Sequence, residues 1–153
     1  MAANPNTDFV AGSILTASQQ NRFGRGVMGY VVYNSGNISV GTGIADVTGA
    51  TVTFTAVANR AYKVTFSASV NKGVTSGYFN WFITNGANVV QSDGFMDIVI
   101  GKTITFTNNY LVTGLAAGTQ TLKMRALTDT GACTIYASGN NKYTFIVEDI
   151  GPI

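Results

Sequence analysis

The chain has 153 residues, of which 46% are hydrophobic and 10% charged, with a formal net charge of +2 and no histidine. This length fits one domain that folds without disulfides or metals, and the nine basic residues are too scattered to form a nucleic-acid-binding stripe. Average soluble domains carry about 25% charged residues, and net charge normally keeps small proteins apart, so we infer a largely neutral surface and a chain that works within an assembly.

Residues 1–27 have little period-2 alternation and are interpreted as an N-terminal docking arm. Thr16 and Gln19 have the spacing of a capping box, which predicts about two turns of helix ending at Gly24. So short a helix is marginal alone, and we expect the arm to become ordered on a neighbouring subunit or another surface. The expected docking residues are four apolar anchors and two arginines suited to carboxylates on a partner: Phe9, Ile14, Leu15, Arg22, Phe23 and Arg25.

From Met28 onward, apolar residues recur at every second position, which predicts strands throughout residues 28–153. The aromatic stretch at residues 78–83 has two apolar faces and is expected to be central or to lie at an interface. The clearest sets of apolar residues that line one face of a predicted strand are Val52 and Phe54; Tyr62, Val64, Phe66, Ala68 and Val70; Ile104, Phe106, Tyr110 and Val112; Leu122, Met124 and Ala126; and Tyr143, Phe145 and Val147.

Glycine and asparagine pairs separate these strands. Asn85-Gly86 and the Asp129–Gly131 segment are predicted hairpin turns, because these residues tolerate positive φ. About eight to ten strands, with no amphipathic helix to cover a parallel sheet, predict an all-β fold. The expected architecture is an antiparallel β-sandwich or jelly roll that follows an arm with one short helix.

Catalytic constellations are largely excluded. Without histidine, the chain has no Ser-His-Asp or Cys-His site and lacks the commonest metal ligand, so we expect no enzyme activity, cofactor or metal. Gly41-Thr42-Gly43 lacks the lysine of a phosphate-binding loop and is read as a turn. The only cysteine, Cys133, is expected to be a buried thiol, which fits synthesis in a reducing compartment.

Two carboxylates lie close together in sequence. Asp93 and Asp97 are four residues apart, so an extended strand directs both to one face but keeps them well separated. We favour the interpretation that these two carboxylates are solvated, in a turn or at the rim of the fold, over a catalytic glycosidase pair or a Ca²⁺ site. The sequence has no basic region ahead of its mildly apolar N-terminal stretch and no run of about 18 apolar residues, so neither secretion by a signal peptide nor a membrane span is expected.

Both ends and the centre of the sequence resemble short virion proteins of tailed phages, especially of actinobacteria, that are described as head decoration or minor tail proteins. The resemblance lies in residues 12–21 and 25–29, in residues 52–56 and 60–68, and in residues 145–152. It implies a trimeric β-sandwich that attaches to a phage particle through its N-terminal segment. The protein would be made in the host bacterial cytoplasm and would lie on the virion surface.

Three functions stay open at this point. The first is a capsid decoration protein that binds the major capsid protein and stabilises the head, which the absence of a long fibre shaft favours. The second is a minor tail or fibre-tip protein, associated with other tail proteins, that binds a host surface glycan or receptor. The third, a carboxylate-based glycan hydrolase, is disfavoured. The candidate aromatics for glycan binding are Tyr78, Trp81, Tyr136 and Tyr143, although alternating strand aromatics more often belong to the core.

Overall fold

The computed structural model describes residues 24–153, which form ten β-strands and no helix. The all-β prediction is therefore confirmed, while the short helix predicted after Thr16 lies outside the described residues. None of the described residues belongs to a helix that could span a bilayer. The strands are β1 (Gly26–Tyr33), β2 (Ile38–Val40), β3 (Ala45–Ala56), β4 (Arg60–Lys72), β5 (Gly77–Asn85), β6 (Val90–Ile98), β7 (Thr103–Val112), β8 (Gly118–Thr128), β9 (Cys133–Tyr136) and β10 (Tyr143–Pro152).

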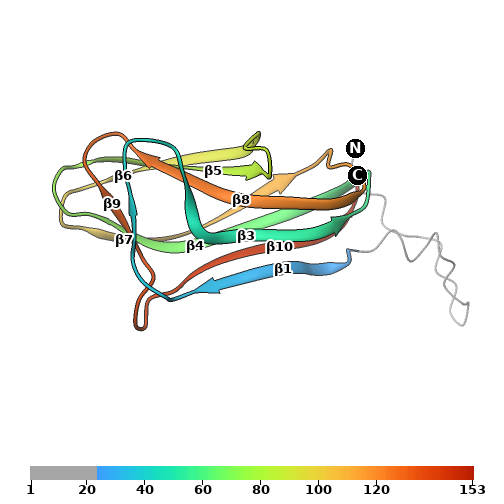
Figure 1. Cartoon of the computed structure of the whole chain (residues 1–153), viewed down its shortest axis with the longest axis horizontal. Coiled ribbons are helices and arrows are strands. Elements are labelled where there is room, and N and C mark those ends of the chain that lie inside the picture. Colours follow the sequence, from blue (N-terminus) through green and yellow to red (C-terminus); the bar gives the residue numbers. More distant parts are fainter. Residues whose placement is uncertain (1–23) are drawn as a thin grey trace, which may run out of the picture.

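The strands form two antiparallel sheets that pack face to face (Figure 1). In the six-stranded sheet, here called sheet A, β4 pairs with β7 on one side and with β10 and β9 in succession on the other. Beyond these, β1 pairs with β10 and β2 pairs with β9. The four-stranded sheet B has the order β3-β8-β5-β6.

This connectivity is that of a jelly roll. If β1 with β2, and β9 with β10, are each counted as one interrupted strand, the ten segments reduce by two to eight, four in each sheet. Eight strands in two sheets are the jelly-roll arrangement. The first strand begins two residues before Met28, since Gly26 and Val27 already pair with Asp149 and Glu148.

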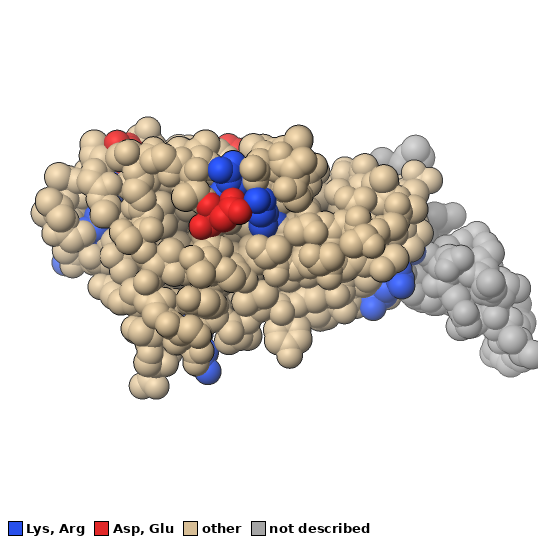
Figure 2. All heavy atoms as spheres, in the orientation of Figure 1, with Lys and Arg blue, Asp and Glu red and all other residues tan. Residues whose placement is uncertain are grey.

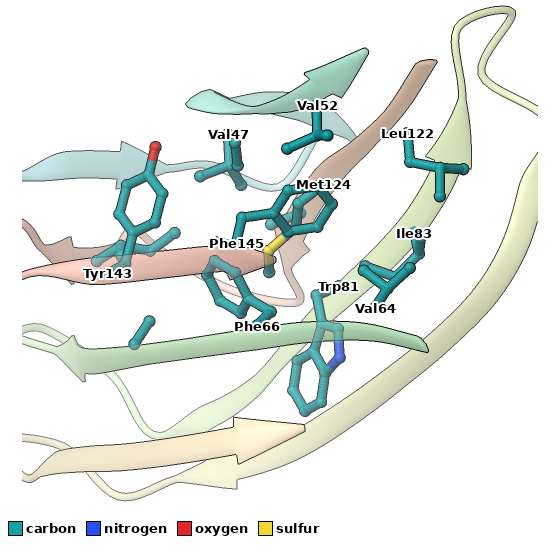
Figure 3. Close-up of a cluster of buried hydrophobic side chains, with 14 of the residues drawn as sticks. Val47, Val52, Val64, Phe66, Trp81, Ile83, Leu122, Met124, Tyr143 and Phe145 are labelled. Carbon is teal, nitrogen blue, oxygen red and sulfur yellow. The ribbon is translucent and has the colours of Figure 1, made fainter. Parts of the chain in front are cut away.

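The core fills the space between the two sheets, with side chains from both pointing inward (Figure 3). Tyr62, Val64, Phe66, Ala68 and Val70 of β4 are all buried, as the alternation predicts. The Phe66 ring packs at centroid distances of 5.7 Å from Phe106 and Tyr143 and 6.5 Å from Phe145. Burying one such side chain contributes about 1.5 to 3 kcal/mol.

The aromatic stretch lies in an interior strand of sheet B, so its predicted central position is confirmed. Phe79 and Trp81 of β5 are buried, whereas Tyr78 and its alternate neighbours face outward. Gly94 of β6 lies opposite Trp81, and a Cβ there would sit 2.7 Å from the indole Cζ2. Only glycine therefore lets β6 approach the indole this closely.

One predicted turn is confirmed and the other is corrected. Asn85-Gly86 begins the tight connection between β5 and β6, where Asn88 has a φ of 65°. The Asp129–Gly131 segment is a turn but not a hairpin, because it carries the chain from β8 in sheet B to β9 in sheet A. The sequence signals the reversal, but long-range pairing decides which strand follows in which sheet.

A buried lysine holds this crossing in place. The Lys72 ammonium, on β4 of sheet A, donates to the Thr128 hydroxyl at 2.7 Å and to the Asp129 carboxylate at 2.6 Å. Lys72 is fully buried, so these acceptors replace its lost hydration. The bond from Lys72, assisted by backbone N–H donors, lowers the pKa of Asp129 to about 2.

We predict that Lys72→Met raises the pKa of Asp129 toward its ordinary value of 3.8. In the native protein, the contribution of ionised Asp129 to stability is complete above the unfolded-state pKa and is lost as pH falls toward 2. Carboxyl NMR titration measures the pKa directly. Lys63→Met is the control, because it removes a lysine from a half-exposed ion pair elsewhere and should leave the pKa of Asp129 unchanged. If Asp129 had the same pKa in the native protein and in Lys72→Met, Lys72 would not be the cause of its low pKa.

Candidate functional site

Most charges of the described residues are neutralised in pairs. Figure 2 shows a face on which charged atoms are few and one group of acidic and basic side chains touches. Such a surface has little net electrostatic repulsion to resist association. The ion pairs are Arg60–Asp149 at 2.6 Å, Lys63–Glu148 at 2.5 Å, Lys72–Asp129 at 2.6 Å, and Asp46 with Lys123 at 2.8 Å and Arg125 at 2.9 Å.

The outer face of sheet A carries a ladder of uncharged side chains across β4 and β7. These side chains satisfy one another by cross-strand hydrogen bonds and leave no charge in this part of the face. The pairs are Thr65–Asn109, Ser67–Thr107 and Ser69–Thr105, each at 2.7 Å.

The same face becomes apolar toward β1. Tyr30, with 67% of its surface exposed, lies opposite Ile146, and the exposed Val32 lies opposite Thr144. The Lys63–Glu148 pair neutralises itself nearby. We call Tyr30, Val32 and Ile146, together with the ladder of uncharged side chains across β4 and β7, the neutral face. A surface with few charges and an exposed aromatic side chain is typical of the centre of a protein interface.

The point where residues 1–23 join the body is closely packed. A Cβ on Gly24 would lie 2.8 Å from the carbonyl oxygen of Asp149, so the backbone here touches β10. Arg25 is exposed and is the one predicted docking residue that the structure describes; Phe9, Ile14, Leu15, Arg22 and Phe23 lie outside the described residues. Beside it is a hollow of about 530 Å³ lined by Arg25, Val57, Ala58, Asn59, Arg60 and Pro152.

A buried ion pair lies behind this hollow. The Arg60 and Asp149 side chains are only 5% and 0% exposed, and the carboxylate also accepts the backbone N–H of Gly151 at 3.0 Å. The bridge joins the start of β4 to the end of β10, which the register places side by side. It therefore fixes the end of sheet A on which Gly24 packs.

We predict that Asp149→Asn destabilises the protein by about 1.5 to 3 kcal/mol, because it removes the buried charge-assisted bond between the Arg60 guanidinium and the Asp149 carboxylate. The neighbouring Glu148→Gln is a matched control. Its pair with Lys63 is 29% and 41% exposed, so its loss should cost about 1 kcal/mol or less. Chemical denaturation of both variants measures the difference, and similar losses would contradict the distinction.

The carboxylates show no gathered catalytic or metal-binding arrangement in the described chain. Asp93 and Asp97 face outward from β6, as predicted, with Cα atoms about 13 Å apart for a strand rise of about 3.3 Å per residue. Residues 24–153 contain no group of three potential metal ligands among Cys, Asp and Glu. Cys133 is buried as predicted, and burial raises the pKa of its thiol to about 11.

The four aromatic candidates separate into two kinds. Tyr78 is exposed and Tyr136 is half-buried, whereas Trp81 and Tyr143 belong to the core. The Tyr143 hydroxyl donates to the carbonyl of Thr48, and burial raises its pKa above the ordinary range. Phe95 is a further exposed aromatic, with 71% of its surface exposed, and it was not predictable because no aromatic alternation surrounds it in the sequence.

No protein-family model and no curated protein sequence matches the chain. Among solved structures, the chain is similar to the tripod from the baseplate of bacteriophage Tuc2009, with 18% identity, a TM-score of 0.46, and coverage of 94% of this chain and 72% of that one. It is similar to a family 6 carbohydrate-binding module, with 11% identity, a TM-score of 0.35, and coverage of 77% of this chain and 92% of that one. It is also similar to VP2 of the infectious bursal disease virus subviral particle, with 8% identity, a TM-score of 0.44, and coverage of 84% of this chain and 39% of that one. Likenesses at these scores do not indicate a shared function.

Proposed function

We propose that the chain is a structural component of a bacteriophage particle, and that it acts as a capsid decoration protein on the outer head surface. The neutral face is the observation that carries the proposal. Tyr30, Val32 and Ile146 present apolar surface beside hydrogen-bonded hydroxyls, and the nearest ion pair cancels its own charge. A face of this kind is suited to lie against other subunits.

The arm supports the same function. Gly24 and Arg25 lead from the end of the sandwich where the buried Arg60–Asp149 pair fixes β4 against β10. Residues 1–23 therefore start from a firmly held position. Docking of their apolar anchors on the major capsid protein would bridge neighbouring capsomers, and any contact made only in the assembled state stabilises that state by mass action.

The phage assignment rests on the sequence resemblance at both ends and the centre of the chain, and trimeric symmetry rests on that resemblance alone. The alternative location is the tail, where the protein would associate with tail proteins and contact a host receptor or glycan. Copy number separates the two, because a decoration protein is present many times in each particle and a tail-tip protein only a few times. Quantitative mass spectrometry of purified virions measures it.

We predict that deleting residues 1–22 leaves the β-body folded but abolishes its incorporation into virions. The deletion ends before Gly24, so the packing of Gly24 on β10 and all β1 pairs are retained. Circular dichroism verifies folding, and binding to particles that lack the native protein measures occupancy. Normal occupancy by the truncated protein would show that the arm is not the docking element.

The neutral face should also hold copies of the chain together. We predict that Tyr30→Lys weakens the homo-oligomer, because it places a charge in an apolar contact. Phe95→Lys is a matched control, since Phe95 is an equally exposed aromatic on sheet B. Analytical ultracentrifugation at micromolar concentration compares them. A monomeric native protein, or equal dissociation of the two variants, would count against this interface.

A further inference from the structure

The outer face of sheet B contains a small hollow that the proposed function does not use. It has a volume of about 220 Å³ and is lined by Tyr78, Asn80 and Phe95. Asn80 and Phe95 are cross-strand partners, and Tyr78 lies two residues from Asn80 on the same face. The two rings, 39% and 71% exposed, therefore flank an amide. Exposed aromatic pairs around a polar group are typical of ligand sites rather than of a solvated strand.

The side-chain amide oxygen of Asn80 has no hydrogen-bond donor among the described residues. Its Oδ1 atom is buried and accepts no hydrogen bond from the described residues. A buried acceptor without a donor costs about 1 to 3 kcal/mol, so such atoms in native proteins require an explanation. A ligand hydroxyl placed in the hollow that Asn80 lines would supply the missing donor.

Two carboxylates extend the same site. Asp93 and Asp97 lie two residues on either side of Phe95 and face outward with it, each about 7 Å along the strand. Asp97 is also the cross-strand partner of Tyr78. Arg125 of β8 is the basic residue opposite Phe82 of β5, and on the same outer face it is paired with Asp46 of β3, the strand beyond β8. The charge around the hollow is therefore acidic.

We propose that this hollow binds a neutral saccharide through the faces of Tyr78 and Phe95, with Asn80, Asp93 and Asp97 accepting its hydroxyl hydrogens. A hexose combines an apolar C–H face with several hydroxyl donors, which matches two rings and three acceptors. Carboxylates form strong hydrogen bonds to hydroxyl groups. The same carboxylates repel uronic or sialic acids, so the site selects against anionic sugars.

The core beneath the site holds it in shape. Gly94, between Asp93 and Phe95, rests against the buried Trp81 indole, which stacks on Phe106 at a centroid distance of 5.0 Å. The Trp81 Nε1 donates to the Tyr110 hydroxyl from β7. Because β6 cannot move inward, the outward positions of Asp93 and Phe95 are set by the packed core. Pre-organisation of this kind reduces the entropy that binding must overcome.

This inference goes beyond the proposed particle role and is independent of it, because the hollow and the neutral face lie on opposite sheets. The full-length protein is tested on an array of immobilised neutral gluco-, galacto- and manno-oligosaccharides, with their uronic-acid and amino-sugar counterparts beside them. We expect millimolar or tighter binding to at least one neutral oligosaccharide and weaker binding to its uronic-acid form. Isothermal titration calorimetry with the strongest neutral binder then measures affinity.

Phe95→Ala and Tyr78→Ala should each weaken this affinity about tenfold or more, and Asn80→Leu should do the same while retaining the native circular dichroism spectrum. Ile153→Ala, which truncates an exposed apolar side chain outside both the hollow and the neutral face, is the matched control and should bind normally. No neutral binder on the array, a preference for the anionic or amino-sugar form, or native affinity in Phe95→Ala would each overturn the inference. Normal incorporation of Phe95→Ala into virions would leave the particle role standing in every case.

Discussion

The fold depends on the strict alternation of β4. This strand pairs with β7 along one side and with β10 and then β9 along the other, so sheet A is assembled around it. Its even-numbered positions from Tyr62 to Val70 fill the core, while its odd-numbered positions supply the hydroxyls of the neutral face. A register shift of one residue would exchange the two sets, placing the hydroxyls in the core and the apolar side chains on the surface. Burial of the apolar set therefore fixes the register and keeps the hydroxyls on the outer face.

Charge is scarce in this chain, and two of its cations are buried at defined places in the fold. Lys72 and Arg60 are buried at opposite ends of β4, and each is held by a carboxylate from another strand or turn. Burying an ion is costly unless its partners are well placed, so these pairs favour one strand arrangement over others. The two ends of the jelly roll are therefore fixed by polar contacts and its middle by apolar packing.

The alternation made the buried sets of β4, β8 and β10 predictable, because period-2 patterns report directly on which face is covered. The route of the chain after Asp129 was not predictable, since a turn signal does not say in which sheet the next strand pairs. The hollow was also hidden. Asn80 and Phe95 are fifteen positions apart in sequence and meet only through the β5–β6 register, and Gly94 and Met96 give Phe95 no aromatic context.

The two outer faces of the molecule are unlike, so the proposed particle contact and the proposed saccharide site would use different sheets. Sheets in a sandwich pack about 10 Å apart, and here the side chains between them are fully buried aromatic and aliphatic groups. A subunit that covers Tyr30 on sheet A therefore leaves Phe95 on sheet B open to solvent. Gly94 and Trp81 couple the floor of the hollow to the core, and assembly on sheet A would leave this floor uncovered. Binding on the free sheet would then gain from multivalency, since many immobile copies on one particle raise the effective concentration of sites.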